Sequence, residues 1–527
     1  MFWLNGRFGI EVVTPWKHRA VGWAWRSGFC VGVGVWSLAI AAAGWNGGAA
    51  CWGQDQNHAA PPNPPASAPS PLEIVQALET ATIDAIQRAE ASVVAVARYR
   101  NTENPDVTTA IRGQRPRVEP RPRRPGLLVL DDEMAGEPTG PRDFGSGVII
   151  GPNGAILTAY HVVHGAARLE VRARGGLLFE AEIVGADPRS DLAVIAPRNP
   201  AVAAEAQLTP LPLGNAEQLR KGSFLLALGN TFDAAREDGR VSAALGILSN
   251  VDRKLMTPPD DFAQPQLRHL PTLLQLDSKL NLGMSGGAVV NLKGELVGIT
   301  TAAGNPASFD PQAGYAIPLD GLGLRAVEAL REGREVEYGF LGIRLDQETR
   351  TTRIEGVTDG TPAALGGLLT NDLILEVGGR AVSNADQLVL AINRMPVGEE
   401  VPLKIERNGD RLLKTVVLSK LRIQADWPVI VTTKPPSWRG ARFDFTSAVF
   451  APNDLNVLSE MSRGTVSVSE VEPGSPAFQA GLRAGQVIIA IDGQPVATPK
   501  QALQRLNERN GPVTLDTHRG QVTIPAP

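Results

Sequence analysis

The chain has 527 residues and a formal net charge of −4 at pH 7, and at about one domain per 150 residues this length predicts three or four domains. The small net charge excludes a general electrostatic attraction to nucleic acid or to acidic membranes. The aromatic content of 5%, with 55 glycines and 41 prolines, favours a turn-rich, mainly β chain over helical bundles.

Residues 1–50 are predicted to be a signal peptide or an N-terminal membrane anchor. The charged, apolar and small-residue sections follow one another in the order of an export signal. The apolar section at 28–44 is at the short limit for a spanning helix, so a retained anchor is the alternative. The basic residues before it are Arg7, Lys17, Arg19 and Arg26.

Both cysteines, Cys30 and Cys51, lie in or just after this segment. The rest of the chain is therefore neither a disulfide scaffold nor a thiol enzyme. Cys51 follows two alanines and is a candidate for lipidation, although Gly48 stands where a lipidation motif has a large aliphatic residue. Residues 51–71 are rich in Pro, Ala and Ser, which predicts a linker too poor in apolar side chains to pack.

Apolar residues at helical spacing predict a helix from Pro71 to Ala91, and the run 92–97 predicts a strand. Residues 100–143 are rich in Arg and Pro, and they are interpreted as a long insertion in the domain that follows. A solvated loop is the simpler reading of this insertion, and binding of an acidic partner is the alternative.

His161 lies just past the end of a predicted strand, after a first strand and a Pro-Asn-Gly turn at 152–154. Strand ends and loops are where rigid scaffolds present reactive side chains. His164, three residues later, is interpreted as structural. A metal site would need more ligands, and the sequence has no HExxH motif and no Cys/His cluster, so neither a metal nor another cofactor is expected.

Asp191 and Ser285 also stand at junctions between polar turns and apolar strands. An aspartate in such a turn often only caps its own backbone. Ser285 lies within Gly283-Met284-Ser285-Gly286-Gly287, a tight turn that suits a nucleophile beside converging N–H groups, although Gly/Ser clusters are common in ordinary loops. Together the three residues give the order His, Asp, Ser, which is that of chymotrypsin-type proteases.

On these motifs the stretch from Phe144 to about Pro318 resembles the protease domain of the HtrA (Deg) family of envelope serine proteases. The resemblance implies a chymotrypsin-like double β-barrel at residues 72–325. It implies His161 as the base, Asp191 as the residue that orients it, and Ser285 as the nucleophile, with an oxyanion hole from the N–H groups of Gly283 and Ser285. The matching segments are 145–150, 157–163, 190–194, 283–291 and 314–318.

Two residues depart from the family pattern. Met284 precedes the serine and Tyr160 precedes the histidine, at places where the family usually has Asn. Because methionine is flexible and apolar, the turn is expected to be loosely ordered, or ordered only when a substrate or partner binds. The separation of Asp191 and Ser285 is long, and the excess is interpreted as an extended, Pro-rich loop at 253–272 near the site.

The C-terminal part contains an internal repeat. Residues 360–368 and 474–482 each have a turn and a short helix of small residues, followed by a strand that ends in a glycine turn. The repeats resemble two PDZ domains, at 336–421 and 436–523. PDZ domains bind an extended C-terminal peptide by strand addition, and backbone N–H groups of a glycine-containing loop hold its carboxylate.

In the first copy this loop is expected at Gly339, Phe340, Leu341 and Gly342. In the second it is expected at Arg439, Gly440 and Ala441, a poorer match, which suggests weak binding or a role in assembly. The alternative is that both copies are packing modules.

The resulting hypothesis is an exported, ATP-independent serine endopeptidase that cleaves unfolded or damaged proteins in the periplasm or cell envelope of a bacterium. Leu280 lies where the family's primary specificity pocket is lined, which suggests a preference for aliphatic residues before the cleaved bond. The resemblance also implies a homotrimer or larger homo-oligomer. The alternative function is a catalytically impaired PDZ scaffold or chaperone on a protease fold.

Overall fold

The computed structural model describes residues 69–100, 142–205, 208–236, 239–253, 272–301, 313–345, 351–422, 428–450 and 464–526. All of them belong to one compact unit that begins at Pro69. The predicted export segment with both cysteines, and most of the predicted linker, insertion and Pro-rich loop, lie outside the described residues. Within the described ranges, no helix is both long and apolar enough to cross a membrane.

The first barrel contains six antiparallel strands: β1 (Val93–Tyr99), β2 (Arg142–Ile149), β3 (Ile156–Ala159), β4 (Arg168–Arg172), β5 (Leu178–Asp187) and β6 (Leu192–Pro197). Their hydrogen-bonded order is β5-β4-β1-β2-β3-β6, and β6 pairs again with β5, which closes the sheet. Apolar side chains such as Val94, Ile156 and Ile195 fill its interior. A later strand, β21 (Ile430–Val431), joins this barrel at β5.

The second barrel contains β7 (Phe224–Gly229), β8 (Ser242–Arg253), β9 (Leu273–Leu276), β10 (Ala288–Asn291), β11 (Leu296–Thr300) and β12 (Gly314–Pro318). The order β10-β11-β12-β9-β8-β7 is a closed circuit. Short helices connect the strands: α2 (Tyr160–Val163), α3 (Ala201–Glu205) and 3-10 turns at Arg174–Gly176, Ala216–Gln218 and Thr231–Arg236. The helix α4 (Gly321–Arg331) follows β12 and packs against β5 and β6. The predicted double β-barrel is therefore confirmed.

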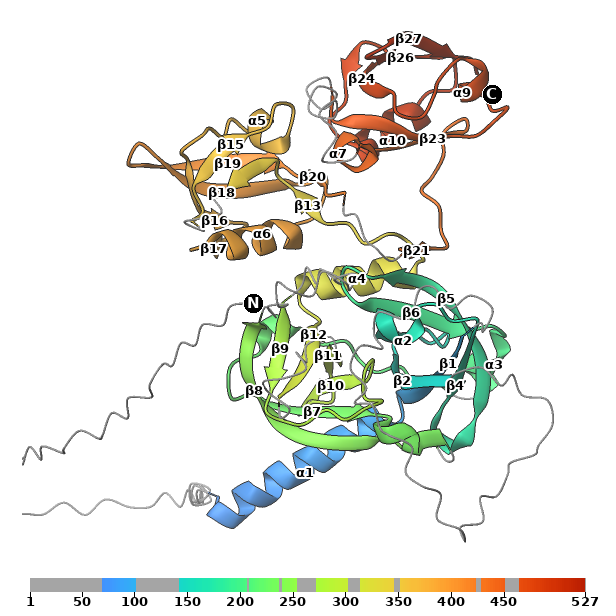
Figure 1. Ribbon diagram of the computed structural model, residues 1–527, viewed down its shortest axis with the longest axis vertical. Helices are drawn as coiled ribbons and strands as arrows, with labels where there is room; N and C mark the ends of the chain where they lie inside the picture. The colour runs from blue at the N-terminus through green and yellow to red at the C-terminus, as the bar shows by residue number, and fades with distance from the viewer. Residues whose placement is uncertain are drawn as a thin grey trace, which may run out of the picture. The chain divides into compact units, whose positions relative to one another are not determined.

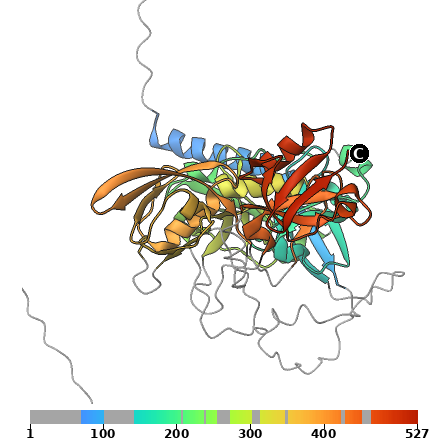
Figure 2. The same ribbon diagram turned by 90° about the horizontal axis from the view of Figure 1, so that it is seen from above.

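The predicted N-terminal helix is present as α1 (Pro71–Glu90). Its start is a capping box in which Ser70 and Glu73 each accept a hydrogen bond from the other's backbone N–H. Its C-terminal half packs against β7 and β10, where Ala85 and Ala89 are fully buried. Its first half extends away from the barrels (Figures 1 and 2), so only part of this helix contributes to the core.

The first C-terminal module has its own core, which includes Ile354, Leu388 and Ile405. Its elements are β13 (Gly339–Phe340), β14 (Ile343–Leu345), β15 (Ile354–Val357), α5 (Pro362–Leu365), β16 (Leu373–Val377), β17 (Arg380–Ala381), α6 (Ala385–Arg394), β18 (Glu400–Arg407), β19 (Asp410–Val417) and β20 (Ser419–Lys420). Asn384 caps α6 by accepting from Gln387 N–H.

The second module repeats this pattern around a separate core that includes Trp438, Val468 and Leu515. Its elements are β22 (Ala441–Phe445), α7 (Thr446–Val449), β23 (Val466–Val471), α9 (Pro476–Gln479), β24 (Val487–Ile491), β25 (Gln494–Pro495), α10 (Pro499–Asn507), β26 (Val513–Thr517) and β27 (Gly520–Ile524). Two cores mean that each module buries its apolar side chains by itself.

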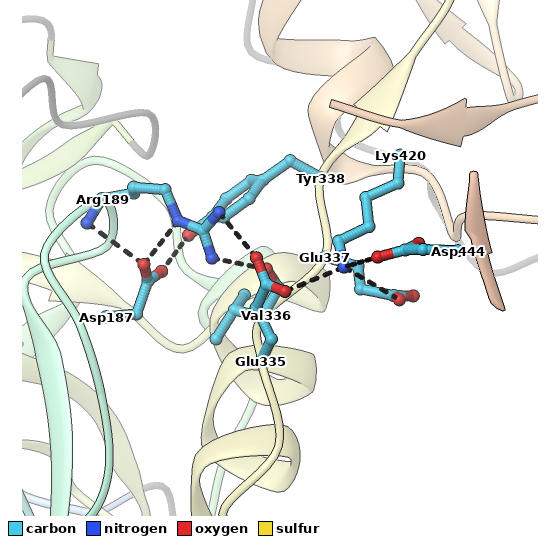
Figure 3. A network of polar contacts seen from close by, with 8 residues as sticks. All are labelled: Asp187, Arg189, Glu335, Val336, Glu337, Tyr338, Lys420 and Asp444. Carbon is cyan, nitrogen blue, oxygen red and sulfur yellow. Dashed lines mark hydrogen bonds and ion pairs between the residues drawn. The ribbon is translucent and has the colours of Figure 1, made fainter. Parts of the chain in front are cut away.

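A buried polar network connects the first barrel to the start of the first module (Figure 3). The Arg189 guanidinium, 4% exposed, lies 2.6 Å from Asp187 Oδ1 and donates to Val336 O at 2.7 Å. It also lies over the Tyr338 ring, whose hydroxyl donates to Asp187 at 2.5 Å. Lys420 of β20 continues the network, because its ammonium contacts Glu335, Glu337 and Asp444.

Candidate active site

His161 lies in the first turn of α2, directly after β3, as the sequence predicted. The turn that carries Asp191 holds this helix start: Tyr160 N–H donates to Asp191 O at 2.8 Å, and His161 N–H donates to Asp191 Oδ1 at 3.1 Å. The His161 side chain keeps 19% of its surface exposed. Hydrogen bonds thus hold the backbone of Tyr160 and His161 in place, while the His161 ring remains accessible.

Asp191 is fully buried, and its carboxylate lies 2.9 Å from His161 Nδ1. Its φ of +55° is in the left-handed region, which Asp adopts more readily than most residues. An ionised carboxylate only accepts hydrogen bonds, so Nδ1 carries the proton in this contact. The neutral ring then has its free lone pair on Nε2, which is the arrangement a general base needs.

Thr301 completes the surroundings of this carboxylate. It directly follows β11, and its hydroxyl donates to Asp191 Oδ2 at 2.9 Å. Sequence reasoning missed Thr301, because no local motif distinguishes one threonine at a strand end from another. Its role depends on two barrels that bring residues 110 positions apart into contact.

Ser285 lies in the turn between β9 and β10, and its carbonyl accepts from Ser146 N–H of β2 at 2.8 Å. Gly283 and Gly286 have φ of +92° and +84°, which only glycine adopts without strain. A Cβ on Gly286 would lie 3.1 Å from Ala159 N at the end of β3, two residues before His161. The turn therefore lies against β3, the strand that directly precedes His161, and His161 and Asp191 are in contact beside it.

Comparison with known proteins identifies the domains of this chain. A trypsin-like peptidase domain model matches residues 145–299, and two PDZ domain models match 339–418 and 467–519. The chain is 31% identical over 388 residues to a probable periplasmic serine endoprotease, DegP-like, of Halomonas elongata, covering 70% of this chain and 74% of the relative. The chain belongs to the DegP-like family of serine endoproteases.

A second curated relative gives the same result. The periplasmic pH-dependent serine endoprotease DegQ of Escherichia coli is 28% identical over 408 residues, covering 75% of this chain and 82% of the relative. A solved HtrA-type protease, AlgW with a decapeptide, is 26% identical with a TM-score of 0.45, covering 65% of this chain and 99% of that one. The family models and the two curated relatives show that the chain is a serine-type endopeptidase with two PDZ modules, and the predicted resemblance is confirmed.

Met284, which departs from the family pattern, is buried in this DegP-like chain with 2% of its surface exposed. Its sulfur accepts from Asn281 N–H at 3.4 Å, and its carbonyl accepts from the Thr300 hydroxyl. Ser146 Oγ adds a bond to Gly283 O at 2.7 Å. The Met284 side chain is therefore packed inside the fold, and the expectation of a loosely ordered turn stays a prediction.

Leu280 is half-buried close to β12: a Cβ on Gly314 would lie 2.8 Å from Leu280 Cγ.

His164 is buried, and its ring stacks on Tyr160. Burial lowers the pKa of His164 to about 4, with a further contribution from Arg98 and Arg100. Across the described ranges, no cluster of three or more His, Cys, Asp or Glu side chains is placed to hold a metal ion.

The two predicted carboxylate loops occupy equivalent places in their modules. In the first module Ala363 N–H donates to Leu341 O at 2.9 Å, and Gly342 has φ of +83°. In the second module Ala477 N–H donates to Arg439 O at 3.2 Å, and Gly440 has φ of +86°. The poorer sequence match therefore has the same position and a similar glycine φ, but Arg439 has a left-handed φ of +48° where Leu341 of the first loop has none.

Polar groups of the second loop already make hydrogen bonds within their own module. Trp438 and Ala441 exchange two backbone hydrogen bonds, of 2.8 and 2.9 Å, which closes the turn on itself. The Arg439 guanidinium donates to Pro525 O at 2.6 Å and to Gly511 O at 2.7 Å. The N–H of Ala441 is thus already engaged, and the arginine holds the end of the chain against the module.

Proposed function

We propose that this chain is an exported, ATP-independent endopeptidase that cleaves extended segments of unfolded or damaged proteins in the bacterial envelope. The observation that carries the proposal is the 2.9 Å contact between His161 Nδ1 and a fully buried Asp191. Asp191 also accepts from Thr301 Oγ1 and from His161 N–H, so its carboxylate has one defined position. An imidazole held in this way is a positioned general base.

Ser285 Oγ bonds to the substrate carbonyl carbon, and its proton passes to His161 Nε2. The carbonyl oxygen becomes an oxyanion, which the N–H groups of Gly283 and Ser285 stabilise. Protonated His161 then gives its proton to the leaving amine as the peptide bond breaks. Water repeats the sequence on the acyl-enzyme, with His161 again taking the proton, and Asp191 stabilises the imidazolium in both halves.

The substrate must present an extended backbone, because strands and loops surround the Ser285 turn. Leu280 is the proposed wall of the pocket for the residue before the cleaved bond, and its apolar side chain favours aliphatic residues there. The loop Gly339–Gly342 is proposed to hold the carboxylate of a C-terminal peptide that extends the first module by one strand. The closed Trp438–Ala441 turn supports weaker peptide binding by the second module.

The homotrimer or larger assembly, and either free or membrane-tethered export, remain part of this proposal. Light scattering on the purified protein measures the assembly. Sequencing the mature N-terminus distinguishes a cleaved signal from a retained anchor and from a lipidated Cys51.

The central test is the reactivity of Ser285. A fluorophosphonate probe should label the wild type, and unfolded casein should be cut by the wild type but not by Ser285→Ala. Ser242→Ala, at the exposed start of β8, removes a serine of the same barrel and should leave cleavage unchanged. Absence of labelling and cleavage in the wild type, also after C-terminal peptides are added, would support the non-catalytic scaffold instead.

A further inference from the structure

Residues 428–433, which connect the two PDZ modules, are attached to the protease domain, and we call this segment the strap. Its strand β21 pairs antiparallel with β5, with Ile430 opposite Ala186 and Val431 opposite Gly185. Figure 1 shows β21 beside β5 and the end of α4. A linker between two binding modules has thus become an additional strand of the catalytic domain.

Hydrogen bonds of side chains and backbone hold the C-terminal end of the strap. Thr432 Oγ1 donates to Val184 O at 2.6 Å, and Thr433 Oγ1 donates to Glu332 O at 2.7 Å. The N–H groups of both threonines donate to Gly333 O at 3.0 Å. Ile430 packs against the core of the first barrel. These contacts are specific enough to give the strap one docked position.

The first end of the strap meets Tyr160, the residue immediately before His161. The Tyr160 hydroxyl donates to Pro428 O at 2.9 Å, while its ring is fully buried in the first barrel and stacks on His164. Its backbone N–H donates to Asp191 O at 2.8 Å. Tyr160 therefore contacts the strap with its hydroxyl and the Asp191 turn with its backbone.

We propose that Tyr160 is a positioning residue for His161, and that docking of the strap through the Tyr160–Pro428 hydrogen bond sets the cleavage rate. The inference rests on the proposed function, since it takes His161 as the general base. It gives the segment between the PDZ modules a direct effect on the protease centre.

The physical reason is that a buried hydroxyl of the first barrel bonds directly to the strap. When the strap leaves, the phenol loses its bond to Pro428 O, and the Tyr160 ring is less firmly held. α2 has only four residues, so a movement of Tyr160 passes directly to His161 and to its contacts with Asp191. Burial raises the pKa of the Tyr160 phenol, with a contribution from Asp187 and Asp191, so the hydroxyl stays protonated and remains a donor.

Conversely, a positioned His161 favours the docked strap, because coupling between two sites is reciprocal. Events that pull on the second PDZ module would undock the strap and lower the cleavage rate.

The test compares Tyr160→Phe, which removes only the hydroxyl, with the double variant Thr432→Val/Thr433→Val, which loosens the strap without changing Tyr160. We expect kcat for a fluorogenic peptide to fall about fivefold in each, a size that one neutral hydrogen bond supports, with KM unchanged. The triple variant that combines Tyr160→Phe with Thr432→Val and Thr433→Val should have a kcat no lower than the lower of the two separate kcat values. The reason is that the tyrosine and threonine substitutions act on the same contact. The matched control is Tyr99→Phe, which removes a hydroxyl bond to Glu170 in the same barrel and should leave kcat unchanged.

Hydrogen exchange supplies a readout that needs no activity. Backbone exchange at residues 428–433 should rise in Tyr160→Phe and not in Tyr99→Phe, and unchanged exchange there would overturn the inference. Cleavage that Tyr160→Phe leaves unchanged, or effects that multiply independently in the combined variant, would overturn this inference alone. A wild-type protein that leaves casein uncut overturns the proposed function and this inference with it.

Discussion

Thr301 shows how a single hydroxyl can define the geometry of a catalytic carboxylate. Asp191 receives hydrogen bonds from His161 and Thr301 inside the protein, where it is fully buried. Each bond to a charged group is worth about 1.5–3 kcal/mol, so the loss of one allows the carboxylate to turn away from the imidazole. Thr301 is therefore a positioning residue that acts on the reaction through Asp191.

We therefore expect Thr301→Val to lower kcat about tenfold with little effect on KM, because the valine keeps the shape and removes only the donor. Steady-state kinetics on a peptide substrate measures this split. Thr272→Val is the control, since the Thr272 hydroxyl also donates to a carboxylate, that of Asp252, at 2.8 Å. Equal kcat values for Thr301→Val and the wild type would mean that His161 alone positions Asp191.

At the scale of elements, α2 depends on β1 for its C-terminal end. The Arg98 guanidinium of β1 donates to His161 O at 3.0 Å and to His164 O at 2.5 Å. A cation that binds the last carbonyls of a helix satisfies acceptors that the helix cannot pair itself. The same positive charge lies close to the His164 ring and disfavours its protonation.

This arrangement predicts acid sensitivity of the protease domain. The pKa of His164 is lowered from 6.5 to about 4 in the folded protein, chiefly by burial. A lowered folded pKa means that the unfolded chain binds the proton first, so the full stability is present above pH 6.5 and is lost as the pH falls toward 4. Between pH 7 and pH 5 the loss should be about 2 kcal/mol.

Calorimetry of the protease-domain transition at pH 7 and pH 5 checks this expectation. His164→Gln cannot titrate, so its Tm should change less between the two pH values than the wild-type Tm. His518→Gln, in the second PDZ module, should keep the wild-type pH dependence. A pH dependence that survives in His164→Gln would assign it to other groups.

At the scale of the whole molecule, the Asp187–Arg189–Tyr338 network joins the Asp191 turn to the first PDZ module (Figure 3). Asp187 is fully buried and interacts with both Arg189 and Tyr338. Removing one partner of a buried ion pair leaves an uncompensated buried charge. This destabilises a protein far more than replacing both partners with apolar residues does. The network therefore favours one way of attaching the first PDZ module to the first barrel.

Arg189→Met should destabilise the protein by about 3–5 kcal/mol, because it leaves Asp187 buried without a cation. The double variant Asp187→Asn/Arg189→Met should recover a large part of this loss, since no unpaired charge remains. Urea unfolding of both variants and the wild type gives the comparison. A double variant less stable than Arg189→Met would show that the network contributes more than charge pairing.

Local sequence patterns were enough to predict the parts of the protein that depend on neighbouring residues. The helix at 71–90, the catalytic motifs around His161, Asp191 and Ser285, and the repeated PDZ pattern were all predicted from local pattern or from family resemblance. Local spacing determines which side chains share a helix face, and a short motif specifies a turn through its glycines.

The tertiary structure alone decided the contacts between distant segments. Thr301 at Asp191, Pro428 at Tyr160, Tyr338 at Asp187 and the buried Met284 each join parts of the chain that sequence pattern treats as unrelated. The physical reason is that closing and packing the barrels selects one partner for each buried polar group among many of the same residue type. An unpaired buried polar group destabilises the fold, so each such group must have its partner. No local sequence feature shows which partner that is.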